Sequence, residues 1–261
     1  MTAPIPRDIP DLPAIPRTHA LFPSYVSQVP ATAVVAPVRR PLAAMLRLLL
    51  TGTALAAVGM AVALGEPLTV LSRFSVQSTL LLALVTAASA RRAWSARRPL
   101  SGALTGAALL YTVTGALTYH LLLADNAQAA PLTGGTTGWH AITGHLLHTA
   151  IPAAAVLDWL LLTPPARLRL RQAAPWLVYP LLYLAFTLTR GHLLPSASPS
   201  RYLYPFLDAA ADGYRHTLAN ALLLGLAIYA LALLLTALDH VRPSPVRPHP
   251  KTGFRLQPPV G

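Results

Sequence analysis

Residues 217–238 read TLANALLLGLAIYALALLLTAL, and no Asp, Glu, Lys or Arg occurs between Arg215 and Asp239. A helix needs about 20 predominantly apolar residues to cross the hydrocarbon core of a bilayer. The run is long enough to do so, and a water-soluble domain has no use for an uninterrupted apolar helix of this length. It therefore predicts a transmembrane helix and places the chain among integral membrane proteins.

Five further apolar runs precede this one along the chain. Only 11% of the 261 residues are charged, whereas a soluble domain has about 25%, so a soluble globular fold is excluded. We expect an all-α, polytopic membrane protein in which residues 42–239 form a bundle of six transmembrane helices. The expected spans are 43–65, 69–90, 100–123, 140–163, 173–190 and 215–239.

The two ends of the chain differ from the apolar middle in composition. Residues 1–41 hold nine prolines and show no apolar period, which predicts a disordered or extended Pro-rich arm. Residues 240–261 hold six prolines and several basic residues, which predicts a basic Pro-rich tail. The stretch from Arg39 to Gly65 has a signal peptide as its alternative interpretation, with Met45 as an alternative start. Its distance from Met1 and its apolar length favour a helix that is retained.

The basic residues are distributed unevenly between the two sides of the predicted bundle. With the N-terminus inside, 16 Arg and Lys residues belong to the inner side and four to the outer side. The positive-inside rule then predicts that both termini are cytoplasmic, in a bacterial inner membrane. This bias explains the net charge of +12 without a nucleic-acid partner, and the absence of cysteine excludes disulfides and thiolate chemistry.

Polar residues within the spans are costly in a bilayer and tend to mark function. Ser75 lies 15 residues from Ala90, and His148 lies 15 residues from Thr163, which are the inner ends of their predicted spans. At 1.5 Å per residue, both lie about 22 Å above the inner boundary. His145 lies one turn above His148 on nearly the same face. The sequence therefore places a hydroxyl and an imidazole at one level in the outer third of the bundle.

A hydroxyl beside a base is the pairing that nucleophilic catalysis requires, together with donors for the developing oxyanion. We expect Ser75 as nucleophile and His148 as base, with Arg73, Arg190, His145 or a backbone N–H stabilising the negative charge. Each of these residues taken alone is also explained by helix packing. Asp158, near the inner end of its span, is expected to pair with an inner arginine or a Trp or Tyr donor. The supporting or pocket residues that we expect are Arg73, Gln77, Thr79, His120, His145, Tyr183, Arg190, Tyr204 and Asp208.

Several short strings sharpen this prediction. They occur in order along the expected spans: RFSVQST at 73–79, HLLHTAIP at 145–152, LDW at 157–159, YPLLY at 179–183 with Arg190-Gly191, and YPFLD at 204–208 with Gly213-Tyr214. In this order they resemble the bacterial six-span membrane proteins called the Pr-six-Pr family, over about residues 43–239. That family is in turn similar to the androgen-induced, FAR-seventeen-a type of eukaryotic membrane proteins.

The resemblance implies a six-helix fold and an activity. The eukaryotic relatives are intramembrane threonine hydrolases that cleave fatty acid esters of hydroxy fatty acids with a Thr and a His. By position, the Thr corresponds to Ser75 and the His to His148. Serine keeps the hydroxyl that the mechanism needs. The chain departs from the bacterial pattern at Thr79, where an Asn is usual, and this removes an amide that could help to stabilise an oxyanion.

Four functions remain open from the sequence. The first is a lipid ester hydrolase that needs no cofactor or metal. The second is a non-enzymatic protein that binds or transports a lipid or small ligand, with membrane lipids as its partners. A cytochrome-like bundle is disfavoured because the histidines gather on one side. The remaining alternative is a zinc hydrolase, for which the candidate ligands are His120, His145, His148, His192 and His216 with Asp208 or Asp212.

Overall fold

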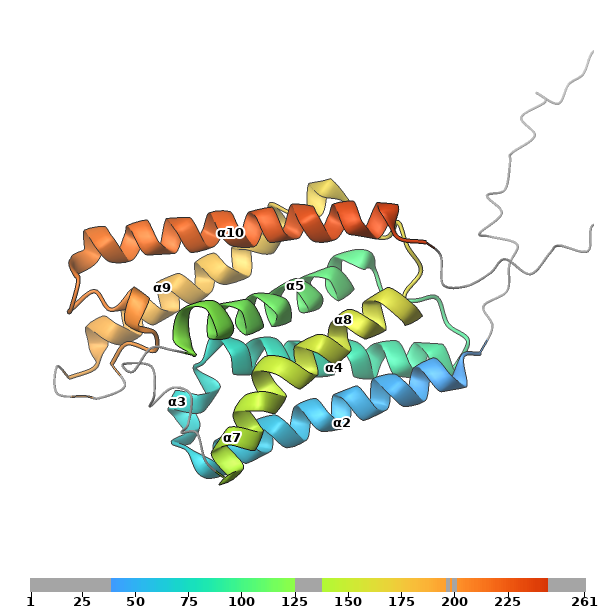
Figure 1. Ribbon diagram of the computed structural model, residues 1–261, viewed down its shortest axis with the longest axis horizontal. Helices are drawn as coiled ribbons and strands as arrows, with labels where there is room; N and C mark the ends of the chain where they lie inside the picture. The colour runs from blue at the N-terminus through green and yellow to red at the C-terminus, as the bar shows by residue number, and fades with distance from the viewer. Residues whose placement is uncertain (1–38, 125–137, 196–197, 199–200, 244–261) are drawn as a thin grey trace, which may run out of the picture. The chain divides into compact units, whose positions relative to one another are not determined.

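The computed structural model describes residues 39–124, 138–195, 198 and 201–243 (Figure 1). The predictions for most of the N-terminal arm and of the C-terminal tail lie outside these residues. The described residues form helices and no strand, which confirms the all-α prediction. The longer helices are α2 (Pro41–Leu64), α4 (Phe74–Trp94), α5 (Gly102–Thr118), α7 (Gly138–His145), α8 (Ile151–Leu162), α9 (Val178–Leu193) and α10 (Gly213–Val241).

Two of the helical segments contain a π-helical turn, in which the backbone is wound more widely than in an α-helix. The turn η1 (Tyr119–Leu123) extends α5. The turn η3 (Leu146–Ala150) joins α7 to α8, so that these three elements form one segment from Gly138 to Leu162. Short elements connect the rest: α3 (Pro67–Leu71), η4 (Leu170–Gln172), η5 (Pro175–Leu177) and η6 (Pro205–Leu207).

Among the described residues, five helical segments are long and apolar enough to cross a membrane. They are α2, α4, α5 with η1, the α7–η3–α8 segment, and α10. The remaining predicted span corresponds to η5 and α9, and α9 has only 16 residues. At 1.5 Å per residue it is about 24 Å long, which is shorter than a hydrocarbon core of about 30 Å.

The second span begins later than the sequence predicted. We expected one helix over 69–90, but the structure has the short helix α3 followed by α4, which runs from Phe74 to Trp94. Glu66 caps α3 by accepting hydrogen bonds from the N–H groups of Leu68 and Thr69, and Pro67 occupies its first turn. Because α3 ends at Leu71, Ser75 becomes the second residue of a new helix.

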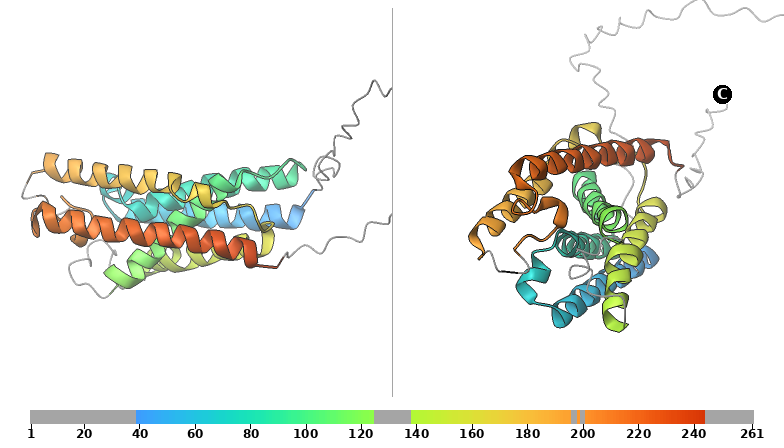
Figure 2. Two further views of the ribbon diagram at one scale, coloured as in Figure 1. Left: turned by 90° about the horizontal axis from the view of Figure 1, so that it is seen from above. Right: turned by 60° about the vertical axis from the view of Figure 1, so that its left-hand side comes forward.

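The helices pack around α5, which contacts α4, α8, η3 and α10 (Figure 2). Helix α2 packs along α4, and α10 lies over α5 and α9 (Figure 1). Helix α2 begins and α10 ends at the same end of this bundle, here called the tail end. The opposite end, here called the cavity end, holds the start of α4, the turn η1 and the start of α10.

Many large apolar side chains face outward from the bundle. Leu42, Leu84 and Leu121 are at least 70% exposed, and α10 exposes a row of leucines along its length. In water, an outer surface of this kind would drive aggregation. In a bilayer the same side chains contact lipid tails at no cost. The described helices are therefore those of a membrane-embedded protein.

One buried and one partly exposed ion pair lie at the tail end of the bundle. Asp239 is fully buried and accepts hydrogen bonds from Trp159, Arg242 and the backbone N–H groups of Arg167 and Leu168. A second pair joins α2 to α8, where Arg47 Nε lies 2.8 Å from a carboxylate oxygen of Asp158. The prediction that Asp158 pairs with an inner arginine is therefore confirmed.

Candidate functional site

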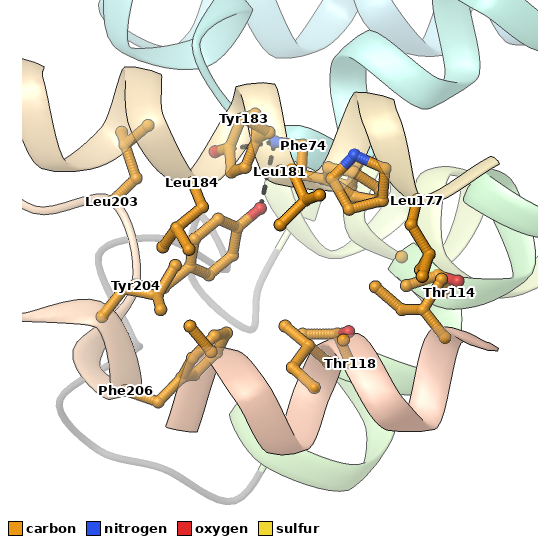
Figure 3. Close-up of a pocket in the computed structure, with 18 of the residues that line it drawn as sticks. Phe74, Thr114, Thr118, Leu177, Leu181, Tyr183, Leu184, Leu203, Tyr204 and Phe206 are labelled. Atoms are coloured by element: carbon orange, nitrogen blue, oxygen red, sulfur yellow. Dashed lines mark hydrogen bonds between the residues drawn. The ribbon is translucent and has the colours of Figure 1, made fainter. Parts of the chain in front are cut away.

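The cavity end contains a cavity of about 510 Å³ enclosed by α4, α5, η3, α9, η6 and α10 (Figure 3). Its wall consists largely of leucine and aromatic side chains, to which α9 and α10 contribute most. A small set of polar side chains interrupts this apolar wall. They are Arg73, Ser75, Thr114, Thr118, Tyr119, His148, Tyr183, Tyr204 and Tyr229.

The start of α4 is held in place by two tyrosines. The N–H groups in the first turn of a helix have no intrahelical acceptor, and Phe74 N–H donates instead to the hydroxyls of Tyr183 and Tyr204, each at 3.1 Å. Figure 3 shows both bonds converging on Phe74 from α9 and from the segment before η6. The Tyr183 hydroxyl also donates to Ser72 O at 2.9 Å. These bonds fix the helix terminus that carries Ser75.

Ser75 is buried within the protein and lines the cavity. Its backbone carbonyl accepts hydrogen bonds from the Ser78 and Thr79 hydroxyls, at 3.0 and 2.8 Å. Its own hydroxyl forms no hydrogen bond with another described residue. Helix α5 approaches closely here, because a Cβ built on Gly115 would lie 3.5 Å from Ser75 Cα and Cβ. The Ser75 hydroxyl is therefore available to a molecule in the cavity.

His148 reaches the same cavity from η3. Its ring stacks on Tyr119, with 4.1 Å between the ring centroids and 3° between the planes. The ring nitrogen Nδ1 is buried and has no hydrogen-bond partner among the described residues. Ser75 and His148, which the sequence placed at one level, thus line one cavity, and no hydrogen bond joins their side chains.

Two other predicted residues, Tyr183 and Tyr204, support α4 as described above, and Arg73 is the residue before it. Burial lowers the pKa of the Arg73 guanidinium, although an arginine with a lowered pKa still carries its charge at neutral pH. Burial also raises the pKa of the Tyr204 hydroxyl, so that this hydroxyl is neutral when it accepts from Phe74. Among the described residues that line the cavity, Arg73 is the one whose side chain carries a permanent charge.

The remaining predicted residues lie around the cavity without lining it. Thr79 is buried and bonds back to Ser75 O, and Gln77 Oε1 accepts from the Tyr179 hydroxyl at 2.8 Å. His120 Nε2 contacts the backbone carbonyl of His148 in η3 at 3.2 Å. His145 is exposed. Arg190 donates to Arg201 O, and Asp208 accepts from two backbone N–H groups of its own turn.

No group of three or more His, Cys, Asp or Glu side chains with the spacing of a metal site occurs in the described part of the chain. The five candidate histidines are spread over η1, α7, η3, α9 and α10. The Asp208 carboxylate accepts from backbone N–H groups of its own turn, and the backbone carbonyl of Asp212 accepts from the His216 ring. The geometry of the described residues offers nothing that favours zinc.

Sequence reasoning missed several of the residues that form the site. Tyr119, Thr114 and Gly115 come from α5 and η1, which the sequence marked only by His120. Thr114 Oγ1 is buried with no partner among the described residues. Gly115 and Tyr119 are four residues apart and therefore share a helix face. A row of polar residues along one face of this predicted span was the signal in the sequence that could have identified these residues.

A second cavity of about 390 Å³ adjoins the first between α5 and α10. The two share several wall residues, including Thr114, Thr118 and Phe206. The rest of its wall is apolar apart from Asn220, whose amide donates to Phe206 O at 3.1 Å. Together the cavities provide a continuous apolar lining beside the Ser75 hydroxyl.

Comparison with known proteins identifies no relative: no family model, no curated protein and no solved structure matches the chain.

Proposed function

We propose that this integral membrane protein hydrolyses lipid esters, with Ser75 as nucleophile and His148 as general base. The observation that carries the proposal is that both side chains line one cavity whose remaining wall is largely apolar. Sites for small molecules are typically apolar pockets with a few convergent polar groups. A cavity of about 510 Å³ at the end of a membrane bundle suits an ester that carries an acyl chain.

The chemistry follows from these two groups. Ser75 Oγ attacks the ester carbonyl carbon as its proton passes to His148, and the carbonyl oxygen becomes an oxyanion. The carbon–oxygen bond to the alcohol then breaks, the alcohol takes the proton from His148, and the acyl group remains on Ser75. Water activated by His148 completes hydrolysis and restores the serine. Because Nδ1 of His148 is the buried ring nitrogen, we assign the proton transfers to Nε2.

The start of α4 supplies stabilisation for the oxyanion. Ser75 is the second residue of the helix, where backbone N–H groups point out of the helix and the helix dipole is positive. Arg73, one residue before the helix, brings a guanidinium to the same cavity wall. Donors placed where negative charge develops are usually the largest single contribution to catalysis of acyl transfer. The proposal therefore assigns a nucleophile, a base and an oxyanion site to one cavity.

The proposal is tested with purified protein in lipid nanodiscs and a fluorogenic long-chain fatty acyl ester. General acid–base catalysis contributes about 100- to 10,000-fold, so His148→Ala is expected to lower kcat by at least 100-fold. Ser75→Ala removes the nucleophile and is expected to abolish turnover. Ser75→Thr retains the hydroxyl and is expected to retain measurable activity. Ser78→Ala is the matched control, because Ser78 is buried on the same helix and does not line the cavity. Full hydrolysis by folded Ser75→Ala would exclude Ser75 as the nucleophile.

A second candidate function is binding of a lipid without turnover. It is favoured by the Ser75 hydroxyl and the His148 ring, which lie on one cavity wall without a hydrogen bond between them. Under this alternative the wild-type protein retains a copurifying lipid, detected by native mass spectrometry, and releases no product from any ester offered. Ser75→Ala then retains the same lipid in the same amount, so that binding is separated from catalysis.

The same proposal includes a family, a membrane and an orientation. Membership of the Pr-six-Pr family rests on the resemblance given above. Placement in a bacterial inner membrane with both termini cytoplasmic is supported by the arginines, which gather at the tail end. The chain has no cysteine, so single cysteines report the side of the membrane directly. In intact cells, an impermeant maleimide is expected to label Arg215→Cys and to leave Arg97→Cys unlabelled, and the reverse pattern would invert the orientation.

A further inference from the structure

Two π-helical turns face each other beside the cavity. The turn η1 ends the α5 segment, and η3 interrupts the segment from α7 to α8. π-helical turns are rare, and they occur often at functional sites because they shift side chains and backbone groups away from the regular helical pattern. The turn η3 carries His148, and η1 carries Tyr119 and His120.

Two consecutive residues of η1 contact His148 in different ways. The Tyr119 ring lies parallel to the imidazole, with centroids 4.1 Å apart. The His120 Nε2 atom lies 3.2 Å from His148 O and 3.1 Å from Thr149 Oγ1. Tyr119 therefore holds the ring plane of His148, and His120 holds its backbone. The same two rings of η1 also meet edge to face, at 5.0 Å and 84°, which fixes them relative to each other.

The contact between His120 and His148 O shows which ring nitrogen of His120 carries a proton. A carbonyl oxygen only accepts, so a bond from His120 Nε2 to His148 O requires a proton on Nε2. The contacts from η1 leave both ring nitrogens of His148 unused, because Tyr119 touches the face of the ring and His120 touches the backbone. An imidazole held in this way keeps its nitrogens for proton transfer while its plane and position are restrained.

We propose that Tyr119 and His120 are positioning residues for His148, which restrain the plane and the backbone of its imidazole beside the cavity that Ser75 also lines. This inference rests on the proposed function. The physical reason is that proton transfer needs the base within hydrogen-bond reach of the hydroxyl. A displacement of about 1 Å can cost on the order of 100-fold in rate. Neither residue exchanges a proton with the substrate.

The test uses a fluorophosphonate with a long alkyl chain, which reacts with an activated serine whether or not the natural substrate is known. Ser75 Oγ bonds to phosphorus, the P–F bond breaks, fluoride leaves, and His148 passes the serine proton to solvent. The maximal labelling rate and the half-saturating probe concentration are measured separately in nanodiscs. The attachment site is read by mass spectrometry.

Tyr119→Leu and His120→Leu are each expected to lower the maximal rate about 10-fold or more. For His120→Leu the half-saturating concentration is expected to stay unchanged, because His120 does not line the cavity. The conservative variants are expected to restore the rate. Tyr119→Phe keeps the stacked ring, and His120→Gln keeps an N–H donor. His145→Ala is the control, since His145 is an exposed histidine of the preceding helix and does not line the cavity.

Four outcomes are separable. Slower labelling that Phe and Gln rescue supports positioning. Wild-type rates in folded Tyr119→Leu and His120→Leu overturn it and leave the proposed function standing. If the wild-type protein carries no label on Ser75 at all, the nucleophile assignment fails and the positioning role fails with it. An unchanged maximal rate with a raised half-saturating concentration assigns both residues to binding and also overturns the inference.

Discussion

Replacing Asp239 by Asn should destabilise the tail end of the bundle, although the two side chains have nearly the same shape. One carboxylate oxygen accepts from Trp159 Nε1 at 3.2 Å and from Arg242 Nε and Nη2 at 3.0 and 2.8 Å. The other accepts from the backbone N–H groups of Arg167 and Leu168, at 2.7 and 2.8 Å. All these partners are donors. The amide NH₂ of Asn must therefore face donors in either orientation.

The magnitude follows from the bonds that are lost. If the NH₂ faces the two backbone N–H groups, two buried donors lose their acceptor, and each loss costs about 1–3 kcal/mol. Because Asn carries no charge, the buried charge pair with Arg242 is also lost in either orientation, which costs about 3–5 kcal/mol. The expected destabilisation of Asp239→Asn is therefore at least about 3 kcal/mol.

Asp158→Asn is the matched control, because Asp158 forms the other carboxylate–arginine pair of the tail end. The side chains of Arg47 and Asp158 are 13% and 18% exposed, against 0% for Asp239. Partial exposure screens the pair, so its loss should cost nearer to the 0–1 kcal/mol of a surface pair. Unfolding in mixed micelles, followed by tryptophan fluorescence as SDS is titrated, compares both variants with wild type. Equal stability of the two variants would refute this account of Asp239.

Three further outcomes are expected. A Cβ at Gly102 would overlap a backbone carbonyl of the neighbouring segment, whereas a Cβ at Gly52 would have nothing within 4 Å. In thermal unfolding, Gly102→Ala should therefore lower the free energy of unfolding by about 1–3 kcal/mol, and Gly52→Ala should leave it unchanged. Gly115→Ala should keep ester hydrolysis, because the methyl group meets the proposed nucleophile at an ordinary contact distance of 3.5 Å; the larger Gly115→Val should cut kcat/KM about 10-fold by displacing the ester. A hydrogen bond from Thr69 lowers the pKa of Glu66 below 4.5, so its contribution to stability is complete above pH 4.5 and is lost as the pH falls through the folded pKa. The stability difference between wild type and Glu66→Gln should therefore disappear in acid, and a difference that grows in acid would contradict this sign.

The helical architecture could be predicted because long apolar runs have few alternatives to a membrane helix. The ends of the runs were less certain. The start of α4 was predicted at residue 69, five residues too early, because 67–73 is apolar enough to continue a span. The cap at Glu66-Pro67 marked the start of a helix, but it began the short helix α3 instead of α4. Hydropathy alone does not show whether a helix that begins there is the short helix α3 or the membrane span α4.

Counting residues predicted that Ser75 and His148 lie at the same depth in the membrane. It could not predict whether their side chains point toward each other. Facing depends on helix rotation, which is set by packing against neighbouring helices. The turn η3 adds to the difficulty, since a π-helical turn shifts the faces of the residues that follow it and no residue type marks its position. Tyr119 was missed because only its contact with His148, which the sequence does not show, distinguishes it from an ordinary interfacial tyrosine. Asp239 was taken for the end of a span and proved to be a buried acceptor.

The two ends of the bundle differ in whether their buried polar atoms form hydrogen bonds. At the tail end, both oxygens of Asp239 are satisfied by several donors. At the cavity, His148 Nδ1 and Thr114 Oγ1 are buried without a hydrogen-bond partner among the described residues. Each such atom costs about 1–3 kcal/mol, a substantial part of a total stability of about 5–15 kcal/mol. Both atoms are shielded from the cavity as well, so a ligand forms hydrogen bonds with them only if the neighbouring side chains move. The ester substrate that we propose has an acyl chain that suits the apolar wall and a polar linkage that can bond to the Ser75 hydroxyl, which has no partner among the described residues.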